Sequence, residues 1–388
     1  MNGADVQWIE DAIPRPMEAL KVPGCAYALI QGGRVAAQRV HGLADAPAGT
    51  PVTLDTRFSL QSISKSLTAW AVMILVEEGR VDLDLPIHRY VTRWALPPSD
   101  RFDLDLVTPR RLLTHHAGVT EAGFLGVDPR YGPRSLTDAL DCRLPPPNDE
   151  QKRHWAYWKL ADPEPVSVTR PPGEGWNYSN PGFALLQLMV EEVSGQPLRD
   201  FISDRVMKPL GMLRSGFGRE EGLPYAGPHG REGQRNIDYL WPCDAAAGAY
   251  ATIGDLALFA CAAMPGPDGE PPGRGVLSPE AVRAMHTPHG KADQSSLPFE
   301  AGLGHVLLRR DGLLNVHHSG GTIGWRSIFT VFPETGDGFC MLMNGEAAND
   351  LWTPIVRVWR DRVAAAVRSL PGPTHSNVST SVPVEVTS

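Results

Sequence analysis

The sequence is short of cysteine, of lysine and of long apolar runs, and each shortage excludes a class of protein. Its five cysteines are scattered, odd in number and without Cys-x-x-Cys spacing, which indicates neither a disulfide framework nor a zinc site. No uninterrupted apolar run reaches the roughly 20 residues of a transmembrane helix. Four acidic residues lie within residues 1–20, where a secretory signal has a basic start and an apolar centre. We therefore expect buried free thiols, a cytoplasmic location and no membrane partner.

Positive charge is scarce as well. With a formal net charge of −8 at pH 7, the chain lacks the basic surface with which proteins bind nucleic acid. Adjacent histidines at 115–116 and 317–318 point in opposite directions on an extended chain, and no His-Glu-x-x-His pattern is present, so we expect no metal ion and no cofactor. The 388 residues, 42% of them hydrophobic, are typical of a globular protein with one large or two medium domains. The oligomeric state stays open.

One of the six lysines stands three positions after a serine. Residues three apart share a face of a helix, so Ser62 and Lys65 would lie side by side. Chance alone gives roughly 0.3 such Ser-x-x-Lys matches in a chain with so few lysines. Lysine, unlike arginine, can be tuned to accept a proton, and residues 67–76 continue as an almost wholly apolar, central helix. The pair therefore predicts a serine nucleophile activated by a lysine.

The order of the expected elements indicates the fold class. A helix is expected at 5–20 and a hairpin at 24–30 and 34–42, and further strands are expected at 304–308, 313–317, 326–332 and 339–344, before a last helix at 349–367. This order predicts an α/β (α+β) fold: an antiparallel sheet flanked by helices, formed from both chain ends, with an inserted, mainly helical subdomain. The expected divisions are an α/β subdomain at 1–80 and 240–370, a helical subdomain with a loop-rich lid at 81–239, and a flexible tail at 371–388.

Two further segments offer groups that a reactive serine needs. The turn at 173–182 places Tyr178 and Asn180 two residues apart, so that both can face one cavity. Residues 317–324 form a glycine-rich strand end, where backbone amides can approach a substrate oxygen. The irregular stretch at 119–175 is rich in aromatic residues, which is typical of a packed lid over a pocket; the aromatic residues expected to line it are Trp155, Tyr157, Trp158 and Trp176.

Together and in this order, Ser-x-x-Lys at 62–65, Tyr-Ser-Asn at 178–180 and His-Ser-Gly-Gly at 318–321 resemble the serine β-lactamase and penicillin-binding-protein family. The likeness is strongest to its class C-like branch, with family VIII carboxylesterases and D-amino acid amidases. It extends from about residue 24 to residue 344. The resemblance implies a β-lactamase/transpeptidase-like fold and an enzyme that works through an acylated serine.

The resemblance also implies roles for individual residues. Ser62 would be the acylated nucleophile, Lys65 its partner and Tyr178 the group that carries the proton. The backbone amides of Ser62 and Gly321 would form the oxyanion hole. Substrate-binding residues would be Asn180, His318, Ser319, Gly320 and, from the aromatic stretch, Trp176. His318 replaces the lysine of the Lys-Thr-Gly motif, and histidine binds anions more weakly and in a pH-dependent way.

These residues favour a hydrolase of small esters or amides, an esterase or amidase, over an efficient β-lactamase or D-stereospecific peptidase. An acyltransferase or peptide cyclase of the same fold remains open, because the same acyl-enzyme serves either water or another acceptor. A non-catalytic binding member of the fold is the remaining alternative, which the intact serine, lysine and tyrosine disfavour. An α/β-hydrolase is disfavoured because no Gly-x-Ser-x-Gly occurs.

Overall fold

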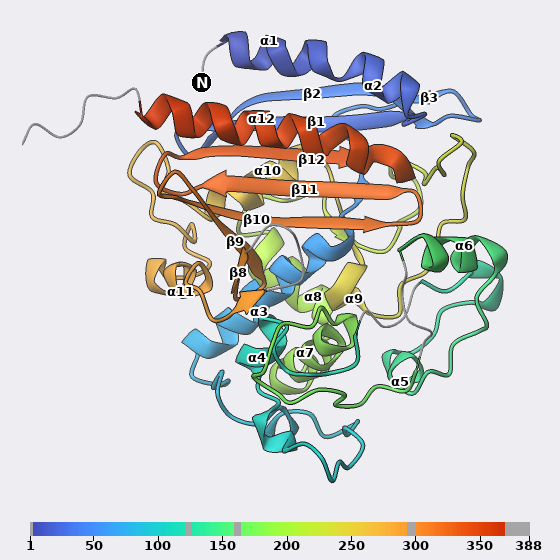
Figure 1. Ribbon diagram of the computed structural model, residues 1–388, viewed down its shortest axis with the longest axis vertical. Helices are drawn as coiled ribbons and strands as arrows, with labels where there is room; N and C mark the ends of the chain where they lie inside the picture. Colours follow the sequence, from blue (N-terminus) through green and yellow to red (C-terminus); the bar gives the residue numbers. More distant parts are fainter. Residues whose placement is uncertain (1–2, 122–125, 159–163, 293–298, 369–388) are drawn as a thin grey trace, which may run out of the picture.

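The computed structural model, which describes residues 3–121, 126–158, 164–292 and 299–368, is built around a nine-stranded antiparallel sheet. The strand order is β3-β2-β1-β12-β11-β10-β9-β8-β7 (Figure 1). The strands are β1 (Gly24–Gln31), β2 (Arg34–Asp45), β3 (Thr50–Pro51), β7 (Lys291–Ala292), β8 (Phe299–Gly302), β9 (His305–Arg310), β10 (Leu313–Thr322), β11 (Trp325–Phe332) and β12 (Asp337–Met343). Pairing of β1 with β12 joins strands from the two ends of the chain, as expected from the sequence.

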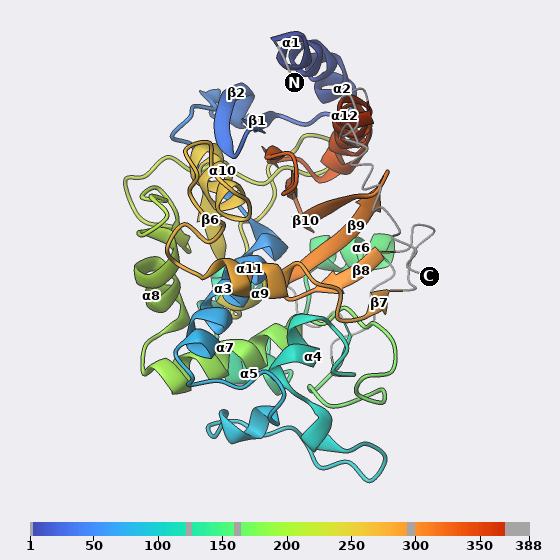
Figure 2. The same cartoon turned by 90° about the vertical axis from the view of Figure 1, so that its left-hand side faces the viewer.

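One face of the sheet is covered by helices from the two chain ends. These are α1 (Gly3–Ala12), α2 (Pro14–Ala19) and α12 (Asn349–Arg368) (Figures 1 and 2). Ile9 and Ile13 are fully buried in the core between them and the sheet, together with Trp359 of α12. The single helix expected at 5–20 is wrong in one respect: it is broken at Ile13, because Pro14 has no backbone N–H with which to continue the first helix.

The other face packs against α3 (Ser64–Glu77) and α10 (Ile253–Ala262). Residues Ser64 to Leu75 of α3 are all buried, which confirms the expected central helix. Trp70 of α3 meets Phe259 of α10 with ring centroids 5.3 Å apart, and Phe259 in turn contacts Phe329 of β11. The middle of α3 is therefore held by aromatic packing through α10 to the sheet.

The mainly helical part lies on the side of α3 away from the nine-stranded sheet (Figure 2). Its helices are α4 (Pro109–Leu113), α5 (Leu136–Leu140), α6 (Asp149–Trp158), α7 (Asn180–Ser194) and α8 (Leu198–Ile202). The chain returns through α9 (Asp244–Ala247), α10 and α11 (Pro279–Met285), and a small sheet pairs β4 (Phe58–Ser59) and β5 (Gly216–Phe217) with β6 (Ala249–Ala251).

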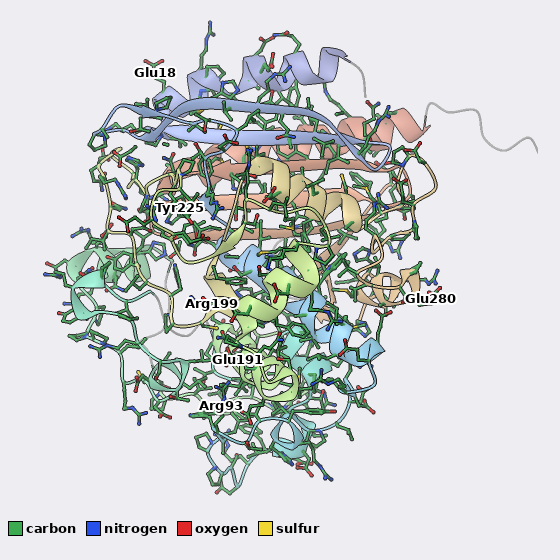
Figure 3. The ribbon with its side chains drawn as sticks, turned by 180° about the vertical axis from the view of Figure 1, so that it is seen from behind. Glu18, Arg93, Glu191, Arg199, Tyr225 and Glu280 are labelled. Atoms are coloured by element: carbon green, nitrogen blue, oxygen red, sulfur yellow. The ribbon has the colours of Figure 1, made fainter. Side chains whose placement is uncertain are left out.

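Two ion pairs involve these helices, one between α8 and α9 and one between a loop and the last turn of α7. Arg199 of α8 holds Asp244 of α9 at 2.8 Å, and Arg93 pairs with Glu191 of α7; Figure 3 labels Arg93, Glu191 and Arg199 from behind. The first pair matters for the site, because α9 supplies a backbone carbonyl to it.

Several predictions from the sequence can be compared with the structure of the described residues. No helix among them is long and apolar enough to cross a membrane. All five cysteines are free, and only Cys142 is not buried. The expected tail at 371–388 lies outside the described residues, and the division into 1–80 with 240–370 and 81–239 stays a prediction.

Candidate active site

Ser62 lies in a tight turn, two positions before the first residue of α3. The turn is a 3-10 helix at Gln61–Ile63, so Ser62 and Lys65 lie on either side of the junction between this short helix and α3. Gln61 has φ +49°, a left-handed conformation that costs energy in a residue with a Cβ. The Gln61 side chain compensates by donating a hydrogen bond to Ser59 Oγ at 2.7 Å. This turn holds the partly exposed Ser62 in place.

Lys65 stands directly behind the serine. Its Nζ donates one hydrogen bond to Ser62 Oγ at 3.1 Å and another to the carbonyl oxygen of Ala246, in α9, at 2.9 Å. The side chain is fully buried, and Nζ lies 4.9 Å from the centroid of the Tyr178 ring and 5.6 Å from that of Phe183. Lys65 is thus fixed by a carbonyl and two aromatic faces rather than by a carboxylate.

Tyr178 is the second side chain that reaches Ser62. Its Oη donates a hydrogen bond to Ser62 Oγ at 2.7 Å. The next residue, Ser179, caps α7 through its Oγ, which accepts from Gly182 N at 3.0 Å, and Pro181 follows in the first turn. The serine oxygen therefore receives hydrogen bonds from two titratable groups, one 3 positions and the other 116 positions from Ser62 along the chain.

Strand β10 passes the nucleophile at very short range. A Cβ on Gly320 would lie 2.3 Å from the carbonyl oxygen of Leu60, so only glycine allows the strand to approach the turn this closely. Ser327 of β11 donates to the same carbonyl at 2.7 Å and locks the two segments together. Ser62 and Gly321 consequently line one cavity.

The cavity has a volume of about 290 Å³. Among the residues that the structure describes, its lining includes no Asp, Glu, Lys or Arg. Trp176 and Phe299 form an edge-to-face pair at one wall, with ring centroids 5.2 Å apart. The full lining is Ser62, Leu113, Thr114, His115, Trp176, Tyr178, Phe299, Ala301, Gly302, Gly304, His305, Val306, His318, Ser319 and Gly321.

His115 supports Tyr178 from behind. Its ring centroid lies 4.4 Å from that of Tyr178, and its Nδ1 accepts a hydrogen bond from the backbone N–H of Ser179 at 3.1 Å. Burial, together with the nearby Lys65 charge, holds the pKa of His115 well below its usual value, so the ring is neutral. The residue adopts φ +60°, which a tight local fold must maintain.

Two more histidines in the lining are neutral for the same reason. Burial lowers the pKa of His318 to about 3, and the charge of Lys65 acts in the same direction. Burial lowers the pKa of His305 to about 4. His318 is therefore no cationic substitute for a lysine at ordinary pH, and the pH-dependent anion binding expected for it is not supported.

The structure brings together most of the residues expected from the sequence. Ser62, Tyr178, Trp176, His318, Ser319 and Gly321 line the cavity, Lys65 lies behind Ser62, and Gly320 packs behind the strand. Asn180 begins α7 and is not among the lining residues. The side chains of Trp155, Tyr157 and Trp158 lie outside the described residues.

Sequence reasoning missed His115, His305, Phe299 and the carbonyl of Ala246. His115 belongs to the Thr-His-His-Ala-Gly segment at 114–118, which the sequence makes noticeable. Only the folded structure shows that the His115 ring contacts Tyr178. Among the described residues, no group of three or more His, Cys, Asp or Glu side chains is placed to hold a metal ion.

Known proteins are similar to this chain in sequence and in fold. The β-lactamase family profile matches residues 9–354. Esterase EstB of Burkholderia gladioli is 33% identical over 209 residues, which cover 54% of this chain and 50% of the esterase, so the match spans about half of that protein. Penicillin-binding protein 4 of Amycolatopsis lactamdurans is 28% identical over 348 residues, 87% of this chain and 84% of that protein.

Among solved structures, the octameric penicillin-binding protein homologue from Pyrococcus abyssi matches with a TM-score of 0.71 at 26% identity. That match covers 94% of this chain and 78% of the other. The family profile extends over most of the chain, and the antiparallel sheet with its flanking helices agrees with the structural neighbour. The chain belongs to the β-lactamase family.

Proposed function

We propose that this protein is a serine hydrolase that forms an acyl-enzyme on Ser62 and acts on small, uncharged esters or amides. The observation that carries the proposal is the position of Ser62 Oγ, which receives hydrogen bonds from both Lys65 and Tyr178 at the wall of an apolar cavity. A hydroxyl becomes a useful nucleophile only where a neighbouring group can take its proton, and these two side chains are the groups within reach.

In the proposed reaction, Ser62 Oγ attacks the carbonyl carbon while its proton passes to the Lys65–Tyr178 pair. The substrate oxygen becomes an oxyanion, which the backbone N–H groups of Ser62 and Gly321 stabilise. When the tetrahedral intermediate collapses, the bond to the alcohol or amine breaks, and Tyr178 returns the proton to that leaving group. A water molecule then repeats the sequence on the acyl-enzyme and releases the acid.

The lining of the cavity supports an uncharged substrate. It offers apolar and aromatic surface together with neutral histidines, and no charged side chain among the described residues faces it. A carboxylate entering it would lose its hydration without gaining a cationic partner. Penicillins and peptides carry such a carboxylate, which makes esters the better candidates. The name of the EstB relative points in the same direction.

A panel of p-nitrophenyl acetate, p-nitrophenyl butyrate, D-phenylalanine amide and nitrocefin tests this proposal. We expect p-nitrophenyl butyrate to have the highest kcat/KM, at least about 100-fold above that of nitrocefin, and Ser62→Ala to abolish all turnover above background. Faster hydrolysis of nitrocefin than of either ester would contradict the proposed substrate class. Undiminished turnover by Ser62→Ala would contradict the proposed nucleophile.

A further inference from the structure

Two histidines on neighbouring strands line the cavity, and each makes the same kind of hydrogen bond through Nδ1. His305 begins β9 and His318 lies in β10, and both line the cavity beside Ser62. His305 Nδ1 lies 2.9 Å from the carbonyl oxygen of Leu303, and His318 Nδ1 lies 2.9 Å from that of Ser319. A carbonyl oxygen only accepts hydrogen bonds, so each Nδ1 carries the proton and each Nε2 is left as an acceptor.

Both rings are held firmly in this state. His305 is 4% exposed and His318 is 6% exposed, and burial keeps both rings neutral through the working pH range. His305 also packs edge-to-face against Phe329, with ring centroids 6.0 Å apart. The preceding Gly304 is anchored on α3, since its carbonyl accepts from Ser66 Oγ at 2.9 Å. The acceptor atoms are therefore preorganised.

Hydrogen bonds within the protein do not use these acceptors. Among the residues that the structure describes, neither Nε2 has a hydrogen-bond partner, and the nearby Lys65 Nζ donates to Ser62 and Ala246 instead. An anion would meet two lone pairs here and no positive charge. A donor such as a hydroxyl or an amide N–H in the cavity would find an acceptor on a buried, fixed ring, which favours the donor over an apolar group of the same size.

We propose that His305 and His318 form an acceptor subsite that selects substrates carrying a hydroxyl or N–H group close to the scissile bond. The proposal rests on the proposed function, because it concerns the substrate of the same cavity. It narrows the substrate class from small uncharged esters to hydroxylated esters or their amide counterparts.

Matched pairs of esters test the subsite on either side of the scissile bond. 2-Hydroxyethyl butyrate and propyl butyrate differ only by a hydroxyl in place of a methyl group in the alcohol. Ethyl 3-hydroxybutyrate and ethyl 3-methylbutyrate differ in the same way in the acid. Acid release at constant pH gives kcat/KM for each ester, and division by its rate constant with hydroxide removes intrinsic reactivity. We expect the hydroxylated ester of at least one pair to be favoured about 3- to 10-fold, the effect of one neutral hydrogen bond.

Substitutions of the two histidines test whether they cause the preference for the hydroxylated ester. His305→Phe and His318→Phe remove the acceptor and keep a ring, so the preference should fall towards 1 in at least one of them, whatever happens to the absolute rate. His289→Phe is the matched control: His289 is half-buried, lies outside the cavity lining and donates to Ala284, so the preference should persist. A preference that survives both His305→Phe and His318→Phe would overturn the proposal.

A binding measurement on the wild-type protein covers the case in which the variants do not fold. 3-Hydroxyphenylboronic acid and 3-methylphenylboronic acid both add reversibly to a reactive serine, and calorimetry compares their affinities without turnover. Tighter binding of the hydroxyl compound, by the same 3- to 10-fold, would support the subsite. Equal affinity of the two, with no preference in either ester pair, would overturn the subsite alone. Failure of both to bind would overturn the proposed function and the subsite with it.

Discussion

At the scale of single residues, the central feature is one oxygen atom with two donors. Because Lys65 and Tyr178 both donate a hydrogen bond to Ser62 Oγ, we expect them to act as a unit. Lys65→Ala and Tyr178→Phe should each lower kcat on p-nitrophenyl butyrate on the order of 10³-fold, and the double variant should be little worse than the worse single one. Steady-state and single-turnover kinetics measure this.

Tyr178→Phe is the sharper of the two variants, because it keeps the ring that packs against His115 and removes only the hydroxyl. If it retained nearly wild-type kcat while Lys65→Ala abolished acylation, the tyrosine would be a substrate contact and the lysine alone would be the base.

The buried histidines make stability depend on pH. The unfolded chain binds a proton at each histidine below about pH 6.5, whereas folded His305 and His318 bind one only near pH 4 and pH 3. Their contribution is therefore complete above pH 6.5 and is lost as the pH falls through that window, by about 1.4 kcal/mol per pH unit for each residue. Urea unfolding at pH 7, 6 and 5 should show a steeper fall for wild type than for His305→Gln. Equal slopes would contradict the neutral, buried state of His305.

The site residues that could be predicted from the sequence are those that belong to short local motifs. Ser62 and Lys65 are three apart on consecutive turns, and Tyr178 belongs to a recognisable motif beside α7. His305 could not be predicted, since its role depends on a carbonyl two residues away and on a strand register that only the folded chain sets. Asn180 begins α7, and its expected contact with the substrate stays a prediction.

At the scale of elements, the approach of β10 to the nucleophile turn rests on one glycine. Gly320→Ala places a Cβ 2.3 Å from the Leu60 carbonyl oxygen, so the strand must move away and carry the Gly321 amide with it. We expect kcat to fall by about 10²-fold or more, as for loss of one oxyanion donor, with KM little changed.

Gly216→Ala in β5 is the matched control. Its Cβ would meet only the end of the flexible Glu220 side chain, at 3.3 Å, and activity should stay near that of wild type. Wild-type kcat in Gly320→Ala would show that the close approach of β10 is not needed for the reaction.

Most elements could be predicted because their patterns are local. The β1–β2 hairpin follows from Gly32-Gly33 between two apolar runs, and the apolar residues of α3 indicate a buried helix. Strand β10 runs five residues beyond the expected end at His317, to Thr322. Glycine has a low preference for strands, and pairing with β11 overrides that preference here.

At the scale of the whole molecule, one buried side chain helps to join the two ends of the chain. Asn344 follows β12; its Oδ1 accepts from Gly24 N at 2.8 Å, and its Nδ2 donates to the carbonyls of Leu43 and Ala44. Asn344→Ala would remove these three buried hydrogen bonds and should lower the free energy of unfolding by about 2–4 kcal/mol.

Denaturant unfolding measures this loss. Asn349→Ala is the comparison, because the Asn349 side chain bonds only Trp352 among the interactions that the structure describes, and its loss should be well below that of Asn344→Ala. Similar losses would mean that Asn344 does not hold the sheet together. That the sheet contains both chain ends could be inferred from element order alone, whereas this contact between residues 320 positions apart could not.

The claim on which the whole account depends is that Ser62 is acylated, and intact-mass spectrometry with a fluorophosphonate probe tests it most directly. We expect a single adduct on the wild-type protein, mapped by peptide sequencing to Ser62, and no adduct on Ser62→Ala. Ser64 and Ser66 lie close by in the sequence and are fully buried, so neither should react. An adduct that persists in Ser62→Ala would show that the nucleophile is another residue.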